Sequence, residues 1–576
     1  MESMRLERSY VSGAYDVPEM DFYGGWVAHA GSFASHQTFF GKEREIALLL
    51  AGECFPGDRF RNGTDQPAIG SWLIDMYEED GDRFFGNVNG LFSGLLVDKR
   101  RRKAFLFNDR YGMERIYYHE SADAFYFASE AKALLRILPQ ARAFDPVGVA
   151  QFLAYGCTVE ERTLFRDIQL LPGGALWSFA AGKYEKGKYF RPETWEALPK
   201  LPADLCESRF QEIFRRIVPH YFEPASQTGI SLTGGLDTRM IMACSEGLPP
   251  GVACYTFAGI NGTTYDALRA AQVAAACGLN HRVLRIGNEF LSHFGKFVDE
   301  TVYATDGSCG VTGAHEIYLN RLAHAIAPIR LTGNFGSEVL RGVSTFKPLR
   351  LDPVLMGDGI QSTIDKEIET ASARKYHPVR QAAFLEIPRR LFGTLAAARS
   401  QIVFRTPYLD NEIVELAFQA PFAKPRSPLP ALRFVNRYRP ELAQIPTDRG
   451  EVGIGRGIGW VLRRIFSEVT FKLDYLDKEG LPHALTPFEP VLSGLSRLGI
   501  LGRHKFLPFR SWFRRELAPF VKERLNDPRV RRNPLWNQDF VGELPNHHMA
   551  GQKNYVSEIN TVLTLEAVDR LLLNGA

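Results

Sequence analysis

Residues 231–239 read SLTGGLDTR and join a short apolar run to a run with helical character. Two adjacent glycines let backbone N–H groups approach a phosphate closely, and the N-terminus of the following helix favours its negative charge. The hydroxyls of Thr233 and Thr238 can donate hydrogen bonds, and Asp237 can hold a magnesium ion that bridges phosphates. The alternative is a plain strand-to-helix turn in which Asp237 and Thr238 only cap the helix. The segment is not a Walker loop, because no Gly-Lys pair followed by Ser or Thr is present.

The surroundings of this segment predict a parallel sheet. Runs that favour strands alternate with helical runs after residue 203, with strands at residues 228–232, 251–258, 281–286 and 328–332 and helices at 238–246 and 266–277. Such alternation is typical of a doubly wound α/β domain with helices on both faces of the sheet. From about residue 457 the chain reads as helical and mixed, with no motif of its own.

The first third of the chain differs, because polar turns separate short apolar runs there. The runs cover residues 45–54, 90–98, 103–107, 116–118 and 124–128, and the basic turn 99–103 joins two of them. This pattern is typical of a β-sandwich. Pro192, Pro199 and Pro202 mark a linker. At roughly 100–200 residues per domain, the length allows two to four domains, and we expect two, residues 1–195 and 203–576.

The composition excludes several classes of function. A formal charge of +3 over 576 residues is too small to indicate binding to nucleic acid or to a membrane surface. Seven cysteines without a CxxC pair indicate neither a zinc site nor a disulfide framework. No apolar run approaches the roughly 18 residues of a membrane span, and residues 1–8 lack the apolar core of a secretory signal. We expect a protein of the reducing cytoplasm.

Residues 233–238 resemble the SGGxDS pyrophosphate loop of the ATP-pyrophosphatase, or PP-loop, family. Further segments resemble class B asparagine synthetase and its relatives, in the same order along the chain. Residues 331–342, LTGNFGSEVLRG, resemble the second phosphate motif GxGxDExxGG, and residues 405–410, RTPYLD, resemble a helix start of that family. Asp410 could also act only as a helix N-cap. In the first third, the resemblance rests on residues 89–92, 108–112, 127–134, 162–165 and 171–173, so that it covers about residues 45–418.

The resemblance implies an N-terminal Ntn-type αββα sandwich, like a glutaminase domain, and a C-terminal adenine-nucleotide α-hydrolase domain. It also implies an ATP-dependent ligase that adenylates a carboxylate, releases pyrophosphate and forms an amide when an amine attacks. ATP and Mg²⁺ are the expected cofactors, with Asp237 and Glu338 as metal ligands and Arg449 and Glu338 as catalytic residues. The expected ATP-binding residues are Ser231, Leu232, Thr233, Gly234, Gly235, Asp237, Thr238, Gly333 and, in the second strand of the sheet, Phe257.

Three departures from the family pattern predict that the N-terminal domain does not hydrolyse glutamine. The family uses a cysteine at the mature N-terminus, whose own amine acts as the base, whereas the first cysteine here is Cys54. An Arg-Gly-Pro-Asp loop of the family has no match between residues 31 and 46. The glutamine-holding segment NGEIYN appears as residues 51–56, AGECFP, in which Glu53 remains but the last Asn is replaced by Pro56. We expect this domain to serve as a scaffold or to hold part of another substrate.

The second phosphate motif also departs from the family. Asn334 stands where asparagine synthetase has Glu and β-lactam synthetase has Tyr, the place of the presumed general base, and an amide side chain cannot act as a base. Ser337 replaces the second metal-binding Asp, while Glu338 is retained and could take the metal role. A late lysine of the family has no counterpart in residues 445–450, where Arg449 could supply positive charge with a different geometry. The alternative is a loop that has simply degenerated.

Three functions remain open. The first is a ligase that uses an amine other than glutamine-derived ammonia, as β-lactam and carbapenam synthetases and lasso-peptide cyclases do; its substrate would be a small-molecule or peptide carboxylate, including a precursor peptide. The second is a divergent asparagine synthetase that takes free ammonia, and the third is a non-catalytic relative that binds a nucleotide or a partner. A sulfur-transfer PP-loop enzyme is disfavoured because no cysteine pair is spaced for it. Residues 99–103 and 528–534 read as surface turns, and His547 and His548 as part of a polar loop without a metal site.

Overall fold

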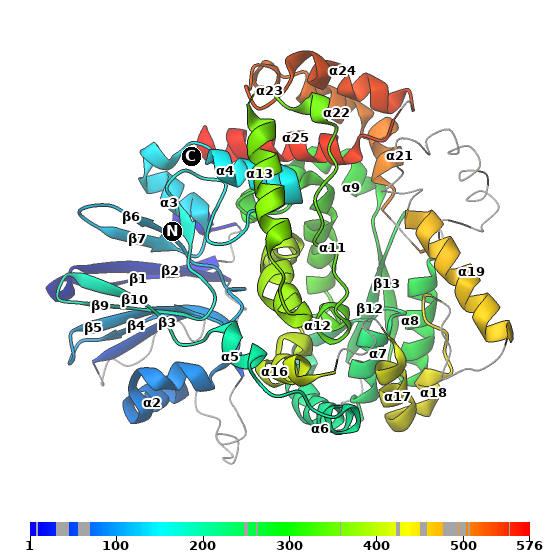
Figure 1. Cartoon of the computed structure of the whole chain (residues 1–576), viewed down its shortest axis with the longest axis horizontal. Coiled ribbons are helices and arrows are strands. Elements are labelled where there is room, and N and C mark those ends of the chain that lie inside the picture. The colour runs from blue at the N-terminus through cyan, green and yellow to red at the C-terminus, as the bar shows by residue number, and fades with distance from the viewer. Residues whose placement is uncertain are drawn as a thin grey trace.

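The computed structural model of the chain is shown in Figure 1. It describes residues 1–576 except residues 7–9, 30–44, 56–68, 247–251, 261–262, 358, 422–426, 450–457, 476–493, 495–500, 502, 505–506, 552 and 576. A sheet-rich N-terminal part lies beside a larger part in which helices surround a parallel sheet (Figure 1). This mixed α/β arrangement confirms the predicted fold class.

The described N-terminal strands form antiparallel sheets. The largest sheet has the strand order β10-β9-β5-β4-β3, a second has the order β7-β6-β8, and β1 pairs with β2. The strands are β1 Tyr10–Val17, β2 Phe22–His29, β3 Ile46–Phe55, β4 Asn89–Asp98, β5 Lys103–Asn108, β6 Tyr117–Glu120, β7 Phe125–Ala128, β8 Gln169–Leu170, β9 Ala175–Ala180 and β10 Lys183–Lys188. The predicted runs therefore coincide with β3 to β7, and the basic turn 99–103 joins β4 to β5 as expected.

The sheets stack in layers because their strands are apolar on both faces. In β4, Leu95 and Val97 belong to the buried cluster between the large sheet and the β6–β7 sheet, which also contains Tyr118. The alternate residues Phe92 and Leu96 face a second cluster, which α2 (Ile69–Asp80) supplies with Trp72 and other apolar side chains. On the other side, α3 (Ala131–Ile137) packs on β6 and β7. The order helix, sheet, sheet, helix is that of the predicted αββα sandwich.

The described residues of the C-terminal part form a sheet of five parallel strands in the order β13-β12-β11-β14-β15. They are β11 Thr228–Ser231, β12 Ala253–Ala258, β13 His281–Arg285, β14 Ile329–Thr332 and β15 Val403–Arg405. The first four match predicted strands, whereas β15 is absent from the sequence prediction. Helices α7 (Leu236–Ala243) and α8 (Tyr265–Ala276) share a buried cluster with one face of the sheet, and α11 (His315–His324) shares another cluster with the opposite face. The sheet is therefore doubly wound, as predicted.

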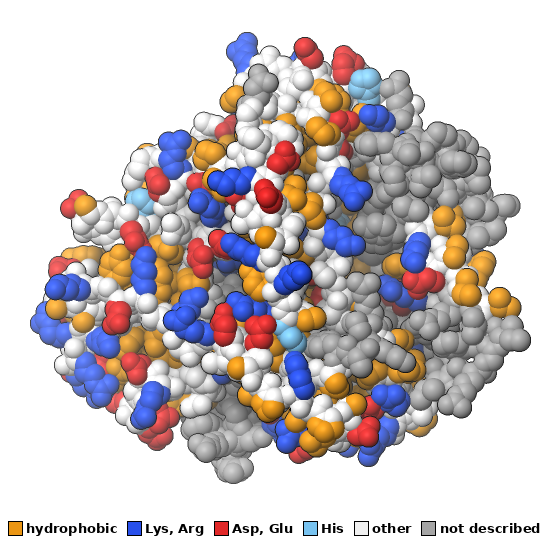
Figure 2. Space-filling model, viewed as in Figure 1, with side chains coloured by type: hydrophobic (Ala, Val, Ile, Leu, Met, Phe, Trp, Pro, Cys, Tyr) orange, Lys and Arg blue, Asp and Glu red, His pale blue; other side chains and the backbone are white. Residues whose placement is uncertain are grey.

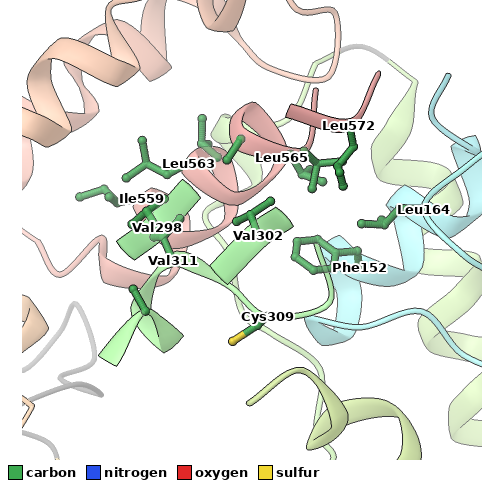
Figure 3. Packing of buried hydrophobic residues seen from close by; sticks show 14 of the residues in the cluster. Phe152, Leu164, Val298, Val302, Cys309, Val311, Ile559, Leu563, Leu565 and Leu572 are labelled. Atoms are coloured by element: carbon green, nitrogen blue, oxygen red, sulfur yellow. The ribbon is translucent and has the colours of Figure 1, made fainter. Parts of the chain in front are cut away.

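A large helical cluster joins the two parts of the chain. Figure 3 shows Phe152 of α4 (Pro146–Tyr155) and Leu164 near Val302 of α10 (Phe294–Ala304) and Leu565 of α25 (Val556–Val568). Fully burying an aliphatic or aromatic side chain contributes about 1.5–3 kcal/mol to stability, so this cluster holds residues on both sides of the expected boundary at 195–203 together. The boundary itself stays a prediction.

The remaining described helices surround these cores. They include α5 Pro192–Glu196, α6 Ala203–Tyr221, α9 Asn288–Ser292, α12 Gly336–Arg341, α13 Ile360–Ala373, α14 Pro378–Arg380, the π-helix η9 Gln381–Arg390, α15 Phe392–Arg399, α16 Asn411–Gln419, α17 Leu429–Tyr438, α18 Pro440–Ala443, α19 Ile458–Tyr475, α21 Phe509–Arg514, α22 Ala518–Leu525, α23 Pro528–Arg531 and α24 Gln538–Met549. Among the described residues, no helix is both long enough and apolar enough to cross a membrane. Acidic and basic side chains are interspersed over the face shown in Figure 2.

Two predictions about the C-terminal region are wrong. His547 and His548 lie in α24 rather than in a polar loop, and His548 is fully buried, where its Nδ1 accepts the N–H of Tyr555 at 3.1 Å. The polar sequence and Pro545 imitate a loop, although Pro545 lies inside the helix. Residues 528–531 form the short helix α23 rather than a turn, because the Asp527 side chain caps its N-terminus.

Candidate active site

Residues 231–239 form the turn from β11 into α7, as the glycine pair predicts. Gly235 is the N-cap residue of α7 and has an extended backbone. The hydroxyls of Thr233 and Thr238 lie 2.8 Å apart, and the N–H of Gly235 donates to Thr233 Oγ1 at 3.2 Å. These polar groups, which the sequence assigns to a ligand, also hold the turn in one shape. We call residues 233–238 the phosphate loop.

The phosphate loop already binds a carboxylate of the chain. The N–H of Gly234 donates to Asp266 Oδ1, on α8, at 2.7 Å. Burial and the nearby carboxylate of Asp448 raise the pKa of Asp266 to about 7. A carboxylate oxygen and a phosphate oxygen make the same kind of contact with an N–H group, so the loop has donor geometry suited to an oxyanion.

A second loop follows β14 and touches the phosphate loop. A Cβ atom on Gly333 would lie 2.5 Å from the backbone nitrogen of Thr238, so a residue with a side chain cannot stand there without moving the loops apart. Asn334 follows, and its Oδ1 accepts the hydroxyl of Thr332 at 2.9 Å. This bond orients Asn334 at the carboxyl end of the sheet, immediately before α12.

The two loops border a cavity of about 380 Å³. Among the predicted site residues, those that line it are Thr233, Gly235, Asp237, Thr238, Gly333 and Glu338. Ser231, Leu232, Gly234, Phe257 and Arg449 are not part of the lining within the described portion of the chain. Ser231 and Leu232 are instead buried at the end of β11, where Leu232 donates its N–H to Tyr255 at 2.8 Å. The structure thus gathers six of the predicted residues around one space.

Asp237 is tied to α12 by two hydrogen bonds. Its Oδ2 accepts the hydroxyl of Ser337 at 2.8 Å and the guanidinium of Arg341 at 3.0 Å. Arg341 also donates to Ser337 Oγ. Burial raises the pKa of Asp237, while Arg341 and the Ser337 hydroxyl oppose this rise. The backbone carbonyl of Asp237 is held as well, because it accepts the Tyr408 hydroxyl at 2.7 Å.

Glu338 lies one residue after Ser337 and faces the cavity. Burial, together with the nearby carboxylates of Asp237 and Glu386, raises its pKa to about 7. A carboxyl group that titrates near neutral pH can accept a proton from a reacting amine. Glu338 is therefore the titratable group of the cavity whose chemistry best suits a general base.

Arg239 is a site residue that the sequence analysis did not single out. Its guanidinium is fully buried and donates to the backbone carbonyls of Leu442, Ile445, Pro446 and Gly234 at 3.2, 2.5, 3.2 and 3.1 Å. These bonds fasten residues 442–446 to the phosphate loop. In the sequence, Arg239 reads as an ordinary polar residue near the start of a helix, next to Asp237 and Thr238.

This fastening brings Arg449 close to the phosphate loop. The N–H of Asp448 donates to the carbonyl of Gly234 at 3.4 Å, and the positive charge of Arg449 acts on Asp237. The Arg449 side chain is exposed, however, and its guanidinium lies 4.4 Å from the ring centre of Phe471 on α19. The predicted catalytic arginine thus stands beside the loop with its charge directed at an aromatic ring.

Charged side chains of β14 and α11 form a second charged region of the cavity. Arg330 of β14 lies 4.7 Å from the ring centre of Phe257 and donates to Asn320 at 2.8 Å. Glu316 of α11 also lines the cavity, and His315, Arg330 and Asn320 lower its pKa against the opposing effect of burial. Phe257 therefore supports the cavity wall through Arg330 rather than lining it.

The predicted metal ligands do not form a complete magnesium site. Mg²⁺ requires six oxygen ligands in near-octahedral geometry and usually keeps several waters. Asp237 Oδ2 already accepts a hydroxyl and a guanidinium. Within the described residues, no group of three or more acidic, histidine or cysteine side chains is placed to bind a metal. The side chains at the phosphate loop do not fit a protein-built Mg²⁺ site.

Glu53, the retained residue of the segment that resembles a glutamine site, bonds across the contact between the two parts. Glu53 of β3 receives two hydrogen bonds from Arg405 of β15, at 2.8 and 2.7 Å. Cys54 is buried, and burial raises the pKa of its thiol well above the usual value. Asp410 caps α16 and also accepts a hydrogen bond from Asn89 at 2.8 Å. The N-cap role anticipated for Asp410 is confirmed, and it is combined with a role in the interface.

Two stretches of the chain match known families. Residues 34–190 match the family described as a glutamine amidotransferase domain, and residues 210–428 match the family described as asparagine synthase. A glutamine-hydrolyzing asparagine synthetase 2 of Bacillus subtilis is 25% identical over 338 residues, which are 54% of this chain and 44% of the relative. An asparagine synthetase of Triphysaria versicolor is 20% identical over 458 residues, 75% of this chain and 64% of the relative. Amidase chyE of Penicillium rubens is 22% identical over 347 residues, 55% of this chain and 50% of the relative. The alignments thus span between 44% and 64% of these relatives.

Proposed function

Because the chain belongs to the class B asparagine synthetase family, we propose that it is an ATP-dependent ligase that forms an amide bond. The observation that carries the proposal is the convergence of the phosphate loop, Gly333 and Glu338 on one cavity. An oxyanion-binding turn can hold the phosphates of ATP, and a carboxyl group that titrates near neutral pH can take a proton from the attacking amine.

The loop residues would act on the phosphates of ATP. The N–H groups of Gly234 and Gly235 and the hydroxyls of Thr233 and Thr238 supply donors at the N-terminus of α7. Phosphate oxygens would replace Asp266 and the internal partners of these donors. The substrate carboxylate oxygen then attacks the α-phosphorus, the bond to the β-phosphate breaks, and pyrophosphate leaves from the loop.

The amide forms when an amine attacks the activated acyl carbon and AMP leaves. The amine must lose a proton, and Glu338 can accept it because its pKa is raised to about 7. Asn334 cannot take this role but can hydrogen-bond to the substrate from the cavity wall. Arg449, beside the loop, would contribute positive charge to the activated substrate by turning away from Phe471.

Magnesium would enter with the nucleotide. The phosphates of ATP provide oxygen ligands of their own, and Mg²⁺ commonly keeps several waters when it binds phosphates. Asp237 and Glu338 would then contribute at most part of the coordination, because Asp237 is already engaged by Ser337 and Arg341.

The attacking amine is not made from glutamine in this proposal. Glu53, the surviving residue of the glutamine-holding segment, is bound by Arg405, and the nearest cysteine, Cys54, is buried with a raised thiol pKa. Both features favour a structural N-terminal domain.

We propose domains at residues 1–195 and 203–576 and a cytoplasmic location.

The substrate is a small-molecule or peptide carboxylate. Two classes of amine donor remain, an amine of the substrate itself or of a peptide, which gives a lactam or macrolactam, and free ammonia, which would give asparagine from aspartate. A precursor peptide is one possible carboxylate donor.

Exchange of labelled pyrophosphate into ATP tests the proposal. The assay is run with a panel of amino acids, diacids and peptides, with wild type, Asp237→Ala and the surface variant Arg529→Gln as a control. We expect substrate-dependent exchange in wild type and in the control. Asp237→Ala should lose exchange at least a hundredfold, because it removes a partial Mg²⁺ ligand and the acceptor that holds Ser337 and Arg341 in place. Exchange that survives the Asp237 substitution would show that the phosphate loop has been assigned incorrectly.

A further inference from the structure

Arg341 stands at a place where the chain needs a positive charge. Its guanidinium is 3.0 Å from Asp237 Oδ2, and both side chains are largely buried, with 18% and 17% exposed. Arg341 also binds Ser337 Oγ, so the three side chains form a closed triangle of hydrogen bonds. A carboxylate at the entrance to a phosphate loop repels phosphate unless a cation offsets its charge.

A metal ion does not fit this triangle as it stands. The Asp237 oxygen that faces Ser337 and Arg341 is already hydrogen-bonded twice. The family resemblance places a metal-binding Asp at position 337, but this chain has Ser337 there. The Ser337 hydroxyl donates to Asp237 and adds no second negative charge. The charge count at the triangle is therefore one carboxylate and one guanidinium, which is neutral without any ion.

We propose that Arg341 is the permanent counter-charge of Asp237 and replaces a metal ion in that role, so that the phosphate loop binds a polyphosphate with little dependence on Mg²⁺. This inference rests on the proposed function, because it concerns the same phosphate loop. Arg341 acts through Asp237 and is a positioning residue, since it does not line the cavity of about 380 Å³ and contacts it only through Asp237, which lines both that cavity and a neighbouring one of about 200 Å³.

The geometry supports a fixed charge rather than a mobile one. Arg341 is the last residue of α12 and is followed by Gly342, whose left-handed backbone (φ 59°) ends the helix. Its guanidinium reaches back along the helix to Ser337, in the first turn of α12, so hydrogen bonds to Ser337 and Asp237 hold it in place. A covalently attached guanidinium also cannot be removed by a chelator, unlike a bound metal ion.

Binding of inorganic pyrophosphate, measured by calorimetry with EDTA and with excess Mg²⁺, tests the inference. The variants are Arg341→Gln, which removes the charge, and Arg341→Lys, which keeps it. Arg433→Gln is the matched control, because Arg433 lines the same neighbouring cavity but pairs with Glu207 at 2.6 Å. Thermal unfolding confirms that each variant is folded.

We expect wild type, Arg341→Lys and the control to bind pyrophosphate in EDTA with an affinity close to that with Mg²⁺. Arg341→Gln should lose about tenfold or more in EDTA and recover most of this loss with Mg²⁺, because the ion then supplies the missing charge. A purely structural role for Arg341 would lower binding equally in both conditions.

Two results would overturn the inference. If wild type depends on Mg²⁺ as strongly as Arg341→Gln does, Arg341 does not replace an ion, while the proposed function stands. If Arg341→Gln loses affinity to the same extent in both conditions, the residue only maintains the fold of α12. An absence of pyrophosphate binding to wild type in either condition would contradict both the inference and the proposed function.

Discussion

Replacement of Arg239 by Met should detach residues 442–449 from the phosphate loop. The buried guanidinium donates four hydrogen bonds, three of them to residues 442–446. A hydrogen bond to a charged group contributes about 1.5–3 kcal/mol, so four represent about 6–12 kcal/mol of gross interaction. The substitution also removes the cost of burying the charge, which is several kcal/mol. We therefore expect a net destabilisation of about 2–5 kcal/mol, concentrated in this segment.

Amide hydrogen exchange read by mass spectrometry measures this effect directly. In Arg239→Met, protection should fall in residues 442–449 and in the phosphate loop, and ATP affinity should fall with it. Arg239→Lys should have an intermediate effect, because lysine keeps the charge but lacks the planar fork that reaches several carbonyls. Arg437→Met is the control, since Arg437 is exposed on α17 and bonds to Gln211 instead. Unchanged exchange and unchanged ATP affinity in Arg239→Met would refute the assignment of Arg239 as the fastening residue.

Three further predictions concern buried charges. In wild type, the rate of amide formation should rise as pH passes through about 7, where Glu338 loses its proton. Glu338→Gln should be slower by about 10²–10⁴ and lack this rise. If the variant keeps the pH–rate profile of wild type, Glu338 is not the base. Burial raises the pKa of Glu558 to about 7, so the folded state keeps a proton that the unfolded chain has lost, and stability falls as pH rises from about 4.5 through 7. Glu558→Gln should remove this cost, about 3 kcal/mol, and raise the Tm at pH about 8 but not at pH about 4; equal Tm shifts at both pH values would contradict the linkage. Glu53→Met leaves the buried Arg405 without its carboxylate and should cost about 3–5 kcal/mol in thermal unfolding, while the double variant with Arg405→Met should be less destabilised; simple additivity would show that the pair does not couple.

The phosphate loop was predictable because its cause is local. A glycine pair between an apolar run and a helical run specifies a strand, a tight turn and a helix without reference to the rest of the chain. The strands β11 to β14 were predictable for the same reason, since each is an apolar run bounded by turn residues. The strand β15 has only three residues and is defined by its pairing with β14, so no local pattern reveals it.

The contacts that complete the site were not predictable because they join distant segments. Arg239 bonds to Ile445, 206 residues later, and Arg341 bonds to Asp237, 104 residues earlier. In the sequence, each of these arginines reads as an ordinary polar helix residue. From the sequence, Ser337 indicated only that a metal ligand is missing. The structure shows that Ser337 and Arg341 both donate to the carboxylate of Asp237.

Transfer of ¹⁸O tests adenylation of a carboxylate at this site most directly. The substrate that supports pyrophosphate exchange is labelled with ¹⁸O in its carboxylate and converted with the amine partner, and the nucleotide product is examined by ³¹P NMR and mass spectrometry. The account predicts that AMP carries one ¹⁸O atom, that unlabelled pyrophosphate is released, and that Asp237→Ala gives neither product. Appearance of ADP with labelled inorganic phosphate, or of AMP without label, would contradict it.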